Sequence, residues 1–72
     1  MKHFTYMQQS FYVSLSNIPT SKYKIEVVSK TGAKTVIHFN DTTAYDNCDS
    51  LDDRKRNEAK RALYKLYKKV SR

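Results

Sequence analysis

The stretch KYKIEVVSKTGAKTVIHF, residues 22–39, contains two runs of strand-forming residues on either side of the only glycine in the chain. In the first run Tyr23, Ile25 and Val27 fall on one side, and charged residues fall on the other, which is the period of a half-buried strand. The second run is rich in β-branched and aromatic residues. The stretch therefore predicts an antiparallel hairpin that turns at Gly32.

The residues before this hairpin continue the strand pattern. The segment FYVSL, residues 11–15, also alternates between apolar and polar side chains. HFTYM, residues 3–7, is either a further short strand or an extension of the same one, because the polar residues between the two segments do not decide the matter. Pro19 lies in a stretch with turn chemistry. We therefore predict an antiparallel meander of three or four strands within residues 1–39.

The period changes in the last third of the chain. Residues 40–49 are rich in Asn, Asp and Thr without a sustained period, which predicts a loop with room for a single helical turn around Ala44 to Asn47. Ser50 followed three residues later by Asp53 is a helix-capping pattern, so we expect one long helix over residues 50–70. The prediction is a single α+β domain, residues 1–72, in which a strand meander precedes a basic amphipathic C-terminal helix.

A helical wheel divides this helix into two faces. At about 100° per residue, one apolar stripe faces the sheet, and it contains Leu51, Ala59, Ala62, Leu63, Leu66 and Val70. The opposite face is basic around one tyrosine, and its candidate nucleic-acid-binding residues are Arg54, Lys60, Arg61, Tyr64, Lys65 and Lys68.

Charge is concentrated in this helix. The chain has a net charge of +7, of which residues 1–49 supply five lysines against four acids, and residues 50–72 supply nine bases against three acids. A solvated helix usually mixes signs at i,i+4 spacing, whereas Arg61 and Lys65 place like charges there. We therefore favour a surface that binds a polyanion over one that is merely solvated, although Lys and Arg are also good helix formers.

Tyr64 indicates which polyanion this could be. A phenol among lysines can stack on an unpaired base, so we expect RNA, with single strands favoured over duplexes. In this hypothesis the cations hold phosphates and Tyr64 stacks. The alternative is that Tyr64 and Tyr67 flank the core, and for Tyr67 we favour that alternative.

No catalytic or metal-binding motif is visible. His3 and His38 could serve as the acid and base of a small ribonuclease, but neither lies in a recognisable motif. The aspartates near residue 50 lack the glycine and the terminal glutamate of an EF-hand loop, and Cys48 has no spaced histidine partner. We expect no catalytic residue, no metal site and no cofactor.

The single cysteine indicates a reducing compartment, which we take to be the cytoplasm, and no apolar run is long enough to span a membrane, so no membrane partner is expected. A 72-residue domain has a small core and leaves sheet surface uncovered, so a homodimer is expected.

The order of strands followed by a basic helix, with the segment KRALYKLYKK at residues 60–69, resembles the small early proteins of large tailed phages. In layout it is most similar to RNA-binding counter-defence proteins that inhibit a host toxin ribonuclease, and small anti-CRISPR proteins share the architecture. The resemblance implies a dimeric RNA binder without catalytic activity in the host cytoplasm. Two other functions stay open: a protein inhibitor that occupies the nucleic-acid or acidic groove of a host protein target, and a toxin-like ribonuclease.

Overall fold

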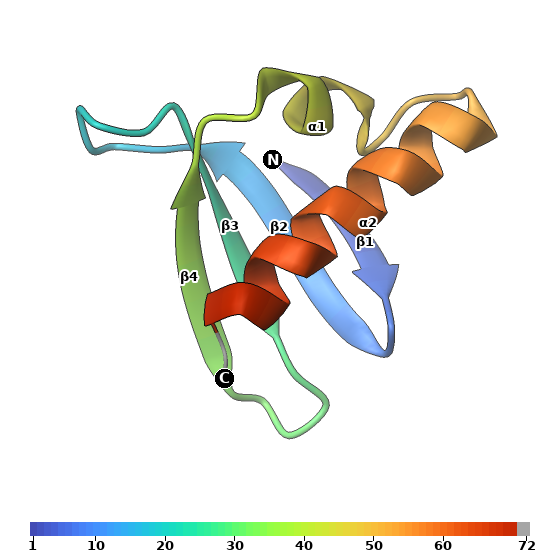
Figure 1. Cartoon of the computed structure of the whole chain (residues 1–72). Helices are drawn as coiled ribbons and strands as arrows, with labels where there is room; N and C mark the ends of the chain where they lie inside the picture. The colour runs from blue at the N-terminus through green and yellow to red at the C-terminus, as the bar shows by residue number, and fades with distance from the viewer. Residues whose placement is uncertain (71–72) are drawn as a thin grey trace.

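The computed structural model describes residues 1–70, which form one antiparallel sheet and two helices (Figure 1). In chain order the elements are β1 (Lys2–Tyr6), β2 (Gln9–Leu15), β3 (Tyr23–Val28), β4 (Lys34–Phe39), α1 (Thr42–Asn47) and α2 (Asp53–Val70). Each strand pairs with its neighbour in sequence, so the sheet order is β1-β2-β3-β4. The predicted α+β meander with a C-terminal helix is confirmed, and it has four strands.

Two tight turns set the register of the meander. Gly32 has a φ of 91° and its N–H donates to the Ser29 carbonyl at 2.9 Å, which confirms the predicted turn between β3 and β4. The turn between β1 and β2 consists of Met7 and Gln8, with φ values of 51° and 65°. Positive φ at both central residues matches the twist of a two-residue hairpin, and such turns usually contain Asn or Gly. The residue types therefore did not indicate that β1 is a separate strand.

One face of the sheet carries the core. The register aligns Phe4 with Phe11 and Val27, and places Val13 beside Ile25, so large apolar side chains form continuous rows across the strands. The rings of Phe4 and Phe11 stack with centroids 4.9 Å apart. Helix α2 crosses this face diagonally (Figure 1) and closes it with Ala59 and Leu63.

A short helix lies within the segment that was predicted to be a loop. In α1, the Asp41 side chain caps the first turn by accepting a hydrogen bond from the Ala44 N–H at 3.0 Å. Ala44 and Cys48 belong to the core, so the helix is held by packing as well as by its cap. The prediction of a loop over residues 40–49 is therefore wrong for residues 42–47, where the structure extends the suggested single turn to a six-residue helix.

Helix α2 begins later than predicted. Asp52 is its cap, because its Oδ1 accepts from the Arg54 N–H at 3.0 Å and from the Lys55 N–H at 3.4 Å. The predicted start at Ser50 is therefore wrong by three residues. Leu51 precedes the helix and is 99% exposed, so it does not belong to the apolar stripe.

Lys2 joins the sheet to α1. Its ammonium donates to the Tyr45 carbonyl at 2.6 Å and pairs with Asp49 at 3.1 Å, at the C-terminal end of the short helix. This contact satisfies carbonyls that the helix cannot satisfy itself, and it places a cation at the negative end of the helix dipole. Both helices pack against the same core, and within residues 1–70 no helix covers the other face of the sheet.

Candidate nucleic-acid interface

The side of α2 that points away from the sheet is lined with cations. At about 100° per residue, these side chains fall within an arc of about 140° on the helix surface. All six are exposed, and together we call them the basic face: Arg54, Lys55, Arg61, Lys65, Lys68 and Lys69.

The basic face has little compensating negative charge. Glu58 lies in the same arc and pairs with Arg54 at 3.6 Å, but both side chains are more than half exposed, so the pair contributes little. Within residues 1–70 the other five cations of the face make no ion pair. Arg61 with Lys65, and Lys65 with Lys69, repel each other at i,i+4 spacing by a few tenths of a kcal/mol per pair. A bound anion would relieve this repulsion.

The structure brings together four of the predicted binding residues, and they are Arg54, Arg61, Lys65 and Lys68. Lys60 lies apart from them, because it is half-buried and its Nζ lies 5.4 Å from the centroid of the Phe4 ring. That contact is a cation–π interaction on the flank of the helix that faces β1. Lys55 and Lys69, which complete the basic face, were not among the predicted binding residues.

Tyr64 packs on the inner side of the helix. Its ring centroid lies 5.1 Å from that of Tyr6 and 6.3 Å from that of Phe11, and the side chain is half-buried. The predicted position of Tyr64 among the outward cations is therefore wrong. Tyr67 flanks the core as we favoured, because its ring meets the edge of Phe11 at 6.0 Å, and its hydroxyl accepts from the Gln9 amide at 3.3 Å.

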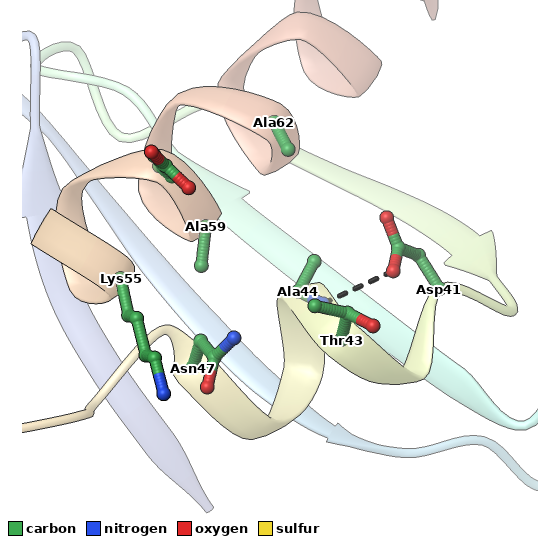
Figure 2. Close-up of a pocket in the computed structure, with 8 residues that line it drawn as sticks. Asp41, Thr43, Ala44, Asn47, Lys55, Ala59 and Ala62 are labelled. Carbon is green, nitrogen blue, oxygen red and sulfur yellow. Dashed lines mark hydrogen bonds between the residues drawn. The ribbon is translucent and has the colours of Figure 1, made fainter.

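A cleft lies between α1 and α2 (Figure 2). Its volume is about 110 Å³, and alanines of both helices line it. The two carboxylates beside it have other partners, because Asp41 caps α1 at Ala44 and Glu58 pairs with Arg54. The cleft is a packing gap between two helices rather than a pair of acids aimed at a substrate.

The two histidines do not form an acid–base pair within one molecule. His3 is in β1 and His38 is in β4, at opposite edges of the sheet, and three strand spacings, about 14 Å, separate these two strands. The His3 ring stacks on Tyr12 with centroids 4.7 Å apart, and His38 Nδ1 lies 3.0 Å from the Ser16 hydroxyl. Residues 1–70 contain no group of three side chains that could hold a metal ion.

Cys48 is a packing residue. Its side chain is 1% exposed, and its Sγ donates to the Tyr45 carbonyl at 3.3 Å. Burial raises the pKa of the thiol, and the nearby Lys2 ammonium only partly opposes this. Because the thiolate is the nucleophilic form, Cys48 is held in its less reactive state.

Neither of the two helices in the described part of the chain is long and apolar enough to cross a membrane. Comparison of the sequence and the structure with protein-family models, curated proteins and solved structures found no match for this chain.

Proposed function

We propose that this protein binds RNA through the phosphate backbone, using the basic face of α2, and that it acts without catalysis. The observation that carries the proposal is a helix surface of one sign: five exposed cations without an ion pair in the described residues, in a chain whose first 49 residues are nearly neutral. Such a surface attracts a polyanion and is relieved of its own repulsion when one binds.

The dimensions of the basic face suit several consecutive phosphates. From Arg54 to Lys69 the helix rises about 22 Å, so its cations form a line rather than a single point of charge. Each phosphate that Lys or Arg neutralises releases condensed counterions, and this release supplies sequence-independent affinity. Arg54 and Arg61 can in addition hold a phosphate with two parallel hydrogen bonds.

The position of α2 favours a flexible strand over a DNA groove. A helix that reads duplex DNA enters the major groove, whereas α2 lies flat across the sheet and presents only its outward arc (Figure 1). Unpaired RNA can follow such a surface with its phosphates. A binder of this kind could shield RNA from a host toxin ribonuclease, which is the counter-defence role that the resemblance implies.

The test is a charge reversal at the centre of the basic face. Arg61→Glu with Lys65→Glu leaves the residues that face the core unchanged, so the melting temperature should stay close to that of the wild type. The affinity for a fluorescent RNA oligonucleotide should fall at least about tenfold at low salt, because two phosphate contacts are replaced by repulsion.

The matched control is Lys22→Glu with Lys30→Glu. These lysines are exposed, lie between strands, and change the net charge by the same amount. The control should lose no more than about threefold in affinity, since long-range charge is screened by salt. The proposal would be overturned if both double variants lost RNA affinity equally, or if Arg61→Glu with Lys65→Glu bound RNA with the affinity of the wild type. If the wild type ignored RNA but bound a host enzyme, the inhibitor alternative would replace it.

A further inference from the structure

The side of the sheet opposite the helices forms a second surface, which we call the open face. Because strand side chains alternate, residues between the core positions point to this side. The register aligns His3 of β1 with Tyr12, Glu26 and Val36 of the next three strands. No element among residues 1–70 packs over this row.

The open face carries a pair of stacked rings. The rings of His3 and Tyr12 lie 4.7 Å apart with an angle of 25° between their planes. His3 is exposed and Tyr12 is half-buried, and because the two rings cover each other on one side, a base can stack only on an outer side of the pair. Single-stranded RNA is bound in this way by sheets, through unpaired bases that stack on aromatic side chains.

A hollow adjoins Tyr12. Its volume is about 300 Å³, and it is lined by Met1, Tyr12, Ser14, Lys24 and Glu26. The lining combines a ring with an ammonium donor, a carboxylate acceptor and a hydroxyl that can do both. The edge of a nucleobase also carries donors and acceptors, so the chemistry of the hollow matches a base better than a purely apolar ligand.

The composition of the open face argues against a second copy as its occupant. Its well-exposed large apolar side chains are Met1 and Val36, and the surrounding positions are mostly polar or charged. The centre of a stable interface between copies is more apolar and depleted of charge. Lys24 and Glu26 belong to this surface and lie on β3, one of the two inner strands.

We propose that the open face binds an unpaired nucleobase of RNA, stacked on the His3–Tyr12 pair, with its edge directed to Glu26, Lys24 and Ser14. This inference rests on the proposed function and moves the base contact from Tyr64 to the other side of the molecule. The smallest extent of the protein is 21 Å, so a strand that reaches both surfaces has to pass around a sheet edge. A very short oligonucleotide therefore occupies one surface at a time.

The experiment compares tetra-adenylate with a short RNA duplex, using amide chemical shifts and affinity. Tetra-adenylate should shift the resonances of His3 and Tyr12. Tyr12→Ala should lower the affinity for tetra-adenylate about tenfold, the effect of losing one stacked base. Tyr12→Phe keeps the ring and should bind within about twofold of the wild type. Tyr12→Ala alters an inner strand and could disturb the fold. His3→Ala, at the exposed edge, is therefore a second variant, and it should also lower the affinity for tetra-adenylate.

The duplex separates this inference from the proposed function. Its bases are paired, so Tyr12→Ala and His3→Ala should leave duplex affinity unchanged, whereas Arg61→Glu with Lys65→Glu should lower it at least about tenfold at low salt. The open-face proposal would fail if tetra-adenylate shifted only α2 resonances, or if Tyr12→Ala and His3→Ala bound it with the affinity of the wild type. Either result would leave the proposed RNA binding by the basic face intact. If neither RNA bound, both proposals would fail. If Tyr12→Ala converted a dimer to a monomer, the face would belong to a second copy instead.

Discussion

At the scale of single residues, Lys2 shows how a cation can face the core side of a sheet. Burial lowers the pKa of Lys2, but the hydrogen bond and the charge of Asp49 outweigh this effect, so the pKa is raised above its ordinary value of 10.5. The ammonium also donates to the Tyr45 carbonyl and lies 4.3 Å from the centroid of the Tyr45 ring. One side chain thus completes the end of α1 and holds it against β1.

We expect Lys2→Met to lower the free energy of unfolding by about 1 kcal/mol at neutral pH, because a partly exposed charged hydrogen bond is lost. A raised pKa in the folded state gives stability that is fully present below the unfolded value of 10.5 and is lost as pH rises through the folded pKa. Urea unfolding of both proteins should therefore show a constant difference up to that pH and a shrinking one above it. A difference that persists at higher pH would show that the ammonium charge is not the stabilising feature.

At the scale of elements, hydrophobic alternation was sufficient to predict the hairpin around Gly32 and the strand from Phe11, because one buried face imposes a period of two. The short helix α1 was harder to predict, because six residues cannot show a helical period and its stability comes from packing Ala44 against the core. The turn at Met7 and Gln8 was missed because these residues seldom adopt positive φ.

The exposed position of Arg54, Arg61, Lys65 and Lys68 was predictable, but the positions of Lys60 and of the aromatic residues were not. The predicted stripe includes Leu51 and Val70, which are exposed, and omits Tyr64 and Tyr67, which pack against the core, so the inner side of the helix is rotated from the predicted one. The structure centres the inner side near Leu63, so Tyr64 comes to lie against the sheet. Tyrosine can either bury its ring or present it to a ligand, and sequence period does not distinguish the two. Arg61 and Lys65 were placed correctly because charged side chains avoid the core.

Tyr64→Ala should lower the free energy of unfolding by about 2 kcal/mol, since a half-buried ring in contact with Tyr6 and Phe11 is removed. The affinity for RNA and its dependence on salt should stay close to those of the wild type. Lys68→Ala is the matched change on the exposed side of the same helix, and it should weaken RNA binding with little effect on melting temperature. If Tyr64→Ala left the free energy of unfolding unchanged and lowered the affinity for single-stranded RNA, the base would stack on the helix instead.

At the scale of the whole molecule, the described residues 1–70 form a sheet with one covered face, one open face and two unpaired edge strands, β1 and β4. Self-association would pair the backbone groups of an edge strand and would add buried surface to a small core. Joining two copies at an edge would leave both the basic face and the open face accessible. It would also place two basic faces along one RNA, which raises the affinity through effective concentration.

We therefore expect sedimentation velocity at micromolar concentration to give twice the monomer mass. RNA should bind the dimer without dissociating it, because the edges and the two binding surfaces are separate. A monomer mass together with intact RNA binding would contradict this expectation.

The central claim is that the basic face of α2 holds phosphates, and the salt dependence of RNA affinity tests it most directly. Five cations of the face make no ion pair within residues 1–70, so on single-stranded RNA the slope of log K against log salt should be about −3.5. Arg61→Glu with Lys65→Glu should reduce its magnitude by at least about 1.4, because two contacts are lost. Base stacking on the open face adds affinity without adding to this slope. A wild-type slope near zero, or a slope that the charge reversal leaves unchanged, would contradict the account.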